Sequence, residues 1–134
     1  MKQTPAQIAD GIAEGVRDLN LATQSPGAEG LRYPGDAYSV LGNLSTAASR
    51  LPQSLHQLDT FLVGLLTGDR LRSDDGSDPQ AKVADAVVAL EDAAGYAQAL
   101  REALGRAQSA LTAVAYDTSN EDFDGDQDNE EPEL

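Results

Sequence analysis

The sequence predicts an all-α fold built around a long antiparallel helical hairpin. In two stretches, apolar residues recur at alternating steps of three and four, the a/d spacing of a heptad repeat. The first of these seams contains Leu41, Leu44, Ala48, Leu51, Leu55, Leu58, Leu62 and Leu65. The second contains Val83, Ala86, Leu90, Ala93, Ala97, Leu100, Leu104, Ala107, Leu111 and Val114. With two Phe, four Tyr and no Trp, the composition favours closely packed helices over a sheet.

A short helix is predicted near the N-terminus, over about residues 4–21. Thr4 can cap it, Pro5 suits its first turn, and Gln7 completes a capping box. Its apolar face comprises Ile8, Ile12, Val16 and Leu19. Because glycines weaken a helix interior by about 1 kcal/mol each, this glycine-containing helix is expected to persist by packing on the hairpin.

The second helix is predicted over about residues 36–67, after a Pro- and Gly-rich connection. Asp36 is the expected N-cap, and Gly68 follows the helix as its stop signal. Pro52 lies inside this helix, where a proline costs about 3 kcal/mol and bends the axis. Since the heptad spacing does not change across Pro52, one kinked helix is favoured. The alternative is a break, with Pro52 restarting the helix.

The third helix is predicted over about residues 79–116, after a hinge loop at 68–78. Asp78 is its expected N-cap and Pro79 its first residue. Four of its ten seam residues are alanine, which permits a close approach to the leucines of the second helix.

The domain organisation follows from the charge distribution. Residues 1–116 are expected to form one helical domain, and residues 117–134 an acidic disordered tail. The formal net charge is −14, and the tail contains nine acidic residues and no basic residue. Solvated acidic tails of this kind are typically disordered. Weak calcium binding is the alternative, because the spacing of Asn120, Asp122, Asp124, Asp126 and Glu131 resembles that of an EF-hand loop.

Several classes of function are disfavoured. No basic patch suggests direct binding to nucleic acid, and no apolar run is long enough to span a membrane. No cysteine is present, and His56 is the only histidine, so neither a thiolate metal site nor a catalytic base is indicated. A cytoplasmic, non-enzymatic protein without a cofactor is therefore expected.

The candidate binding residues are apolar residues that lie off the second helix's seam. They are Tyr38, Phe61, Val63 and Leu66. A two-helix hairpin would expose these side chains, and exposed apolar surface commonly marks an interaction site. The expected partner is another protein or a second copy of the chain, for which a homodimeric four-helix bundle satisfies the same seams.

Several short motifs resemble those of small, Ala-rich helical-hairpin proteins encoded in actinobacterial genomes, often in mobile elements. The motifs are Tyr33-Pro34-Gly35-Asp36, Leu41-Gly42-x-Leu44, Leu51-Pro52-Gln53 and Asp74-Asp75-Gly76-Ser77-Asp78-Pro79. The resemblance implies a helical hairpin and a mobile-element or phage setting, but no activity. A secreted hairpin resembling WXG100 proteins is one alternative, although the hinge lacks Trp-x-Gly. An acidic mimic of nucleic acid is another alternative.

Overall fold

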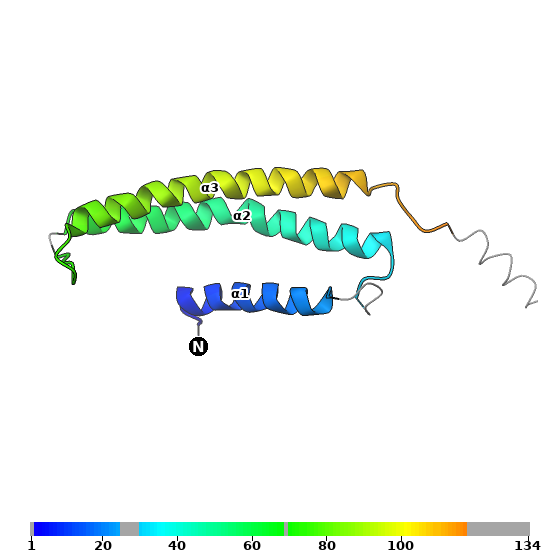
Figure 1. The fold of residues 1–134 in the computed structure, drawn as a ribbon, viewed down its shortest axis with the longest axis horizontal. Helices are drawn as coiled ribbons and strands as arrows, with labels where there is room; N and C mark the ends of the chain where they lie inside the picture. The colour runs from blue at the N-terminus through cyan, green and yellow to red at the C-terminus, as the bar shows by residue number, and fades with distance from the viewer. Residues whose placement is uncertain (1, 25–29, 69, 118–134) are drawn as a thin grey trace, which may run out of the picture. The chain divides into compact units, whose positions relative to one another are not determined.

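The computed structural model describes residues 2–24, 30–68 and 70–117, and these residues form three α-helices and no strand. Helices α2 and α3 run antiparallel and pack side by side (Figure 1). The predicted all-α hairpin is thereby confirmed. The chain divides into two compact units, Met1–Ala37 with Ala113–Leu134, and Tyr38–Thr112. Both the packing of the first helix on the hairpin and the single domain over residues 1–116 stay predictions.

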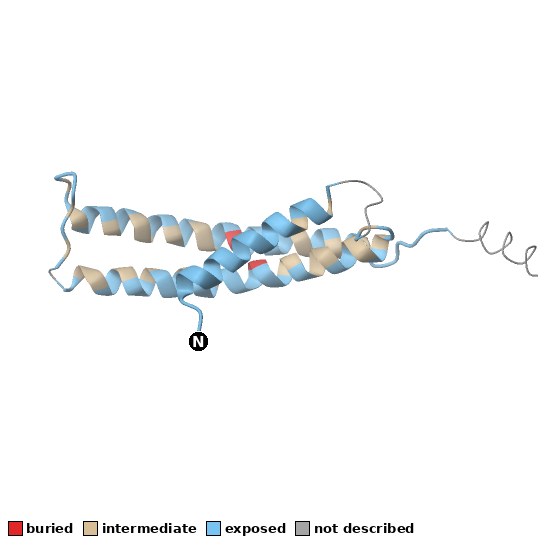
Figure 2. Cartoon of the chain, turned by 90° about the horizontal axis from the view of Figure 1, so that it is seen from below, coloured by how far each residue is buried: buried red, intermediate tan, exposed pale blue. Residues whose placement is uncertain are grey.

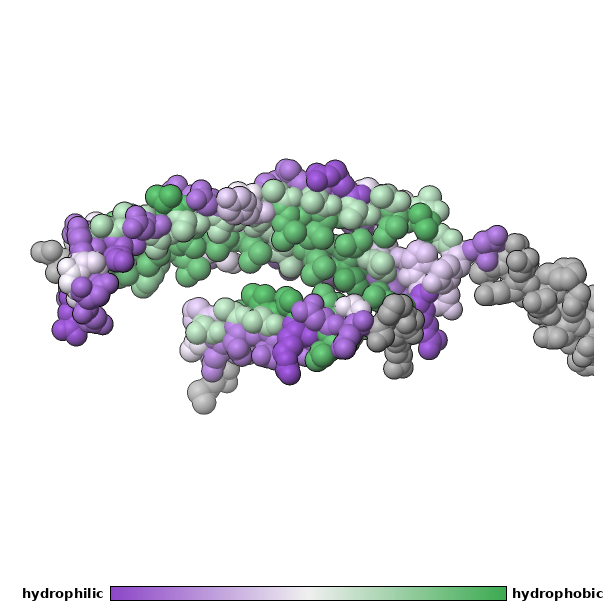
Figure 3. All heavy atoms as spheres, in the orientation of Figure 1, coloured by the Kyte–Doolittle hydropathy of each residue, from purple (hydrophilic) through white to green (hydrophobic). Residues whose placement is uncertain are grey.

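Helix α1 spans Pro5–Ala22 and begins with the predicted capping box. The backbone N–H of Gln7 donates to Thr4 Oγ1 at 3.2 Å, and the backbone N–H of Thr4 donates to Gln7 Oε1 at 2.9 Å. These bonds satisfy two N–H groups at the N-terminal end that have no partner within the helix. The helix is amphipathic, hydrophobic on one side and hydrophilic on the other (Figure 3).

Helix α2 spans Pro34–Leu66, so it begins two residues earlier than predicted. Asp36 lies in the first turn and is not the N-cap. Its Oδ2 accepts hydrogen bonds from the backbone N–H groups of Arg32 at 2.8 Å and Tyr33 at 3.0 Å. The prediction was wrong because Pro34 can occupy the first helical position, where no N–H is needed, and Asp36 then reaches back to the entering chain.

Pro52 is accommodated within a continuous α2. The favoured interpretation of one helix is confirmed, and the alternative of a break before Pro52 is excluded. Because a proline removes one backbone donor and crowds the preceding turn, it bends a helix rather than ending it when packing holds both sides. The buried Ala48 before Pro52 and the half-buried Leu55 after it provide that packing.

Helix α3 spans Pro79–Ala110, six residues shorter than predicted. At its start, Asp78 is the N-cap as predicted, and its Oδ1 accepts from the backbone N–H of Gln80 at 3.0 Å. At its end, the backbone N–H of Leu111 donates to the carbonyl of Gln108 at 3.0 Å, which tightens the last turn. The predicted end at residue 116 was wrong because the chain turns after Ala110, where the N–H groups of Leu111 and Thr112 donate to carbonyl groups three residues back.

The centre of the hairpin is the only place where the described residues are fully buried. Ala48 of α2 is 2% exposed and Ala97 of α3 is 6% exposed. Both alanines were predicted on the two seams. Figure 2 shows one buried segment on each helix, at the same level of the hairpin. The small side chains let the two backbones approach closely there, as the alanine content of the seam predicts.

The loop between α2 and α3 is organised around the carboxylate of Asp75. It accepts hydrogen bonds from the hydroxyl groups of Ser73 and Ser77, and from the backbone N–H of Ser77 at 3.0 Å. These hydrogen bonds, the Ser73 hydroxyl first, hold the pKa of Asp75 well below its ordinary value. Gly76 follows with a positive φ of 80°, a conformation that glycine adopts without strain.

Candidate interaction surface

The four predicted binding residues do not form one patch. Phe61 and Val63 are 62% and 46% exposed, Tyr38 is also exposed, and Leu66 is half-buried. At about 100° per residue, Phe61 lies roughly 140° around the α2 axis from Tyr38 and roughly 160° from Val63. Their spacing along the chain therefore places Phe61 on the opposite side of α2 from Tyr38 and Val63, and their role in binding stays a prediction.

Two cross-hairpin contacts identify which sides of α2 and α3 adjoin. Ser45 Oγ donates to the backbone carbonyl of Arg101 at 3.4 Å, and the side-chain amide of Gln108 lies against Gly42. Gly42 and Ser45 lie on one side of α2, and Arg101 and Gln108 lie on one side of α3. These two sides together form the polar face of the hairpin.

The opposite face of the hairpin is apolar, and we call it the apolar face. On α2 its apolar residues fall within about 80° around the helix axis, and they are Val40, Ala47, Leu51, Leu58, Phe61 and Leu65. The polar residues Asn43 and Ser54 interrupt the same sector. On α3 its apolar residues fall within about 60°, and they are Ala89, Tyr96, Leu100, Ala103 and Ala107. Nearer the loop the same sector contains the charged residues Lys82 and Asp85. The two stripes run along neighbouring flanks of the seam, so they form one surface.

The apolar face exposes large side chains to solvent. Leu58 is 51% exposed and Tyr96 is 74% exposed, in addition to Phe61. In Figure 3 hydrophobic residues cover much of α2 and α3, while hydrophilic residues gather along one edge of α3 and at the hairpin loop. A contiguous surface of this kind is typical of a protein–protein interaction site.

Sequence reasoning identified only part of the apolar face. Leu51, Leu58 and Leu100 were predicted as seam residues, yet each remains more than a third exposed. Tyr96 was not singled out at all. The available signal was the width of the apolar pattern: Tyr96 precedes the seam residue Ala97, so it lies beside the seam and widens the stripe.

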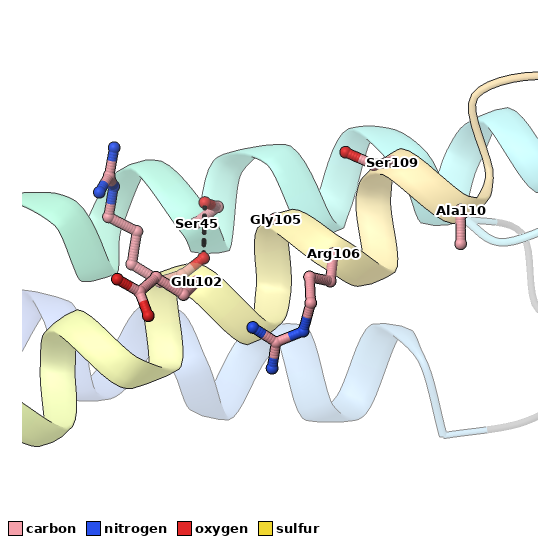
Figure 4. Close-up of a pocket in the computed structure, with 7 residues that line it drawn as sticks. Ser45, Glu102, Gly105, Arg106, Ser109 and Ala110 are labelled. Carbon is pink, nitrogen blue, oxygen red and sulfur yellow. Dashed lines mark hydrogen bonds between the residues drawn. The ribbon is translucent and has the colours of Figure 1, made fainter.

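A shallow groove of about 810 Å³ lies on the other side of the hairpin, lined by Ser45, Arg101, Glu102, Gly105, Arg106, Ser109 and Ala110. Two arginines beside two hydroxyl groups raise the question of an anion site. However, Arg101 and Arg106 are separated by about 140° around the α3 axis. In Figure 4 the Arg106 side chain points away from Ser45. The groove therefore does not direct both guanidinium groups at one ligand.

The other residues considered in the sequence analysis lie away from the apolar face or outside the described residues. His56 is exposed on α2. The possible calcium ligands Asn120, Asp122, Asp124, Asp126 and Glu131 lie outside the described residues, as does nearly all of the acidic tail. Within residues 2–24, 30–68 and 70–117, no three His, Cys, Asp or Glu side chains are grouped to hold a metal ion. None of the helices in this part of the chain has the length and hydropathy needed to cross a bilayer.

Comparison with known proteins finds no match, either among protein-family models or among curated proteins or solved structures. The class of protein, an all-α chain with an antiparallel helical hairpin, is therefore defined by the structure alone. The resemblance to actinobacterial mobile-element proteins stays a prediction.

Proposed function

We propose that this chain is a non-enzymatic interaction protein that binds a protein partner through the apolar face of its α2–α3 hairpin. The observation that carries the proposal is the exposure of Leu58, Phe61 and Tyr96 on one continuous surface. Burial of such side chains contributes roughly 1.5–3 kcal/mol each, so a partner that covers them gains substantial affinity. Large aromatic side chains are also the residues that most often dominate binding energy at interfaces.

The shape of the hairpin supports this function. Helices α2 and α3 have 33 and 32 residues and present the apolar face as two parallel stripes. A helix or a helical hairpin of the partner can lie along these stripes, with its own apolar side chains between them. The acidic tail would add solubility and would steer the approach of basic surfaces.

Site-specific photo-crosslinking in the native host tests the proposal. A photoreactive phenylalanine analogue replaces Phe61 in one variant and Val63 in a matched control, because Val63 is exposed on the same helix but outside the apolar face. We expect protein adducts from position 61 at several times the yield from position 63. Equal yields, or no adducts from position 61, would contradict the proposal. Circular dichroism of both variants confirms that the helices remain intact.

A further inference from the structure

We propose that the partner of the apolar face is a second copy of this chain, which packs face to face so that α2 of one copy lies over α3 of the other. This inference rests on the proposed function and specifies its partner. The two hairpins then form a four-helix bundle with both loops at the same end. Three observations carry it: the length of the face, the alternation of large and small side chains along it, and the charges at its edges.

The first observation is the length of the apolar face. Its α2 stripe runs over 26 residues from Val40 to Leu65, which corresponds to about 38 Å along the helix. An 18-residue helix such as α1 is about 27 Å long and spans only part of this stripe. Helices of 32 and 33 residues span all of it, and a second copy supplies two of them.

The second observation is the order of large and small side chains. The hydrogen bond between Ser45 and Arg101 sets the antiparallel register, in which a step forward along α2 matches a step back along α3. This register places Leu58 level with Ala89, Ala47 level with Leu100, and Val40 level with Ala107.

Rotation about the long axis of the hairpin keeps these levels. When α2 of one copy lies over α3 of the other, Leu58 of one copy therefore lies opposite Ala89 of the other. The other two pairs are opposed in the same way. In each of these three pairs a large side chain faces a small one, as interlocking helices require. Leu51 faces Tyr96 at the fourth level. In the other twofold arrangement α2 lies over α2 and α3 over α3. Large residues would then face large residues between the two α2 helices, and alanines would face alanines between the two α3 helices.

The third observation is the charge at the outer edges of the apolar face. The outer edge of the α2 stripe carries Arg50, and the outer edge of the α3 stripe carries Asp85 and Asp92, whereas Lys82 lies on the inner side of that stripe, toward α2. Placing α2 over α3 brings the basic edge of one copy beside the net acidic edge of the other. Placing α2 over α2 would bring two Arg50 residues toward each other. Opposite charges at the rim favour the first arrangement and set its orientation.

Because the chain contains no cysteine, single cysteines introduced by mutation report the arrangement directly. A Leu58→Cys chain is mixed with an Ala89→Cys chain under mild oxidation. The control mixes Ser49→Cys with Gln98→Cys, since these exposed positions are also level with each other but lie on the polar side of the hairpin. Each disulfide can join only two different chains, because no chain carries both cysteines. Light scattering gives the mass of the unmodified full-length protein.

We expect a mass of twice the 14.0 kDa chain, and a yield of the Leu58→Cys/Ala89→Cys disulfide about tenfold or more above the control, since binding raises the local thiol concentration. A single-chain mass at every concentration overturns the second copy as the partner. A double mass with equal disulfide yields in the two mixtures overturns the arrangement. If position 61 still forms adducts with another protein while the chain is monomeric, the proposed function stands and this inference fails.

Discussion

A methyl group on Gly42 would lie 2.5 Å from Nε2 of Gln108, so the glycine makes room for the glutamine amide that crosses the hairpin from α3 to α2. The atom that would have to move is the end of a flexible side chain. The close approach is thus a local adjustment on the polar face of the hairpin, and it does not require a shift of either backbone.

This relationship predicts different effects for two glycine substitutions. Gly95→Ala meets no atom within 4 Å, so it should raise the free energy of unfolding by about 1 kcal/mol through helix propensity alone. Gly42→Ala should raise it by less, because the Gln108 amide must move. Urea unfolding followed by circular dichroism measures both. In a Gln108→Ala background, Gly42→Ala should recover the full gain. Equal gains from both glycine substitutions in the wild-type background would contradict the contact.

Ala48 and Ala97 should not tolerate large side chains. Because each is almost completely buried on the seam, Ala48→Leu or Ala97→Leu should lower the free energy of unfolding by about 1–3 kcal/mol through overpacking. Ala84→Leu is the control, because Ala84 is exposed on α3, and its effect should stay within about 0.5 kcal/mol. If the buried substitutions prove as mild as Ala84→Leu in urea unfolding, the helices do not pack closely at this level.

The N-cap of α3 should contribute measurably to stability. Asp78→Ala removes the acceptor for the Gln80 N–H and should destabilise the hairpin by about 1 kcal/mol. Asp74→Ala removes an equal charge from the same loop, but its contact with Arg72 is 3.9 Å long and almost fully exposed, so little change is expected. Thermal unfolding of the two variants at matched pH separates capping from charge. The cap assignment fails if the two variants melt alike.

The carboxylate of Asp75 should titrate at unusually low pH. Hydrogen bonds from Ser73 and Ser77 favour its charged form, so its pKa lies below the ordinary value of 3.8. A folded-state pKa below the unfolded value means that the associated stability is present above pH 3.8 and is lost as the pH falls toward the folded pKa. Carboxyl carbon shifts in an NMR titration measure this pKa. The double variant Ser73→Ala/Ser77→Ala should return it toward 3.8; an unchanged value would show that the hydroxyl groups do not set it.

The starts of α1 and α3 and the seam could be predicted from the sequence because their determinants are local. The Thr4–Gln7 capping box and the Asp78–Pro79 start each depend on residues within four positions of one another. The two seams depend only on helical periodicity, which the sequence carries directly, and the burial of Ala48 and Ala97 confirms it. The continuity of α2 through Pro52 followed from the same unbroken spacing.

The candidate binding surface depended on tertiary structure. Helical spacing separates Phe61 from Tyr38 and Val63, but spacing within one helix does not show that Tyr96 of α3 belongs beside the stripe of Leu58. The end of α3 at Ala110 was not predicted, because the apolar spacing of the seam continues past it to Leu111 and Val114. The sequence by itself therefore determined three helices and their inward stripe, because periodicity and capping act within one helix. Only the pairing of α2 with α3 decided which flanks adjoin, because residues far apart in the chain become neighbours through the register of the hairpin.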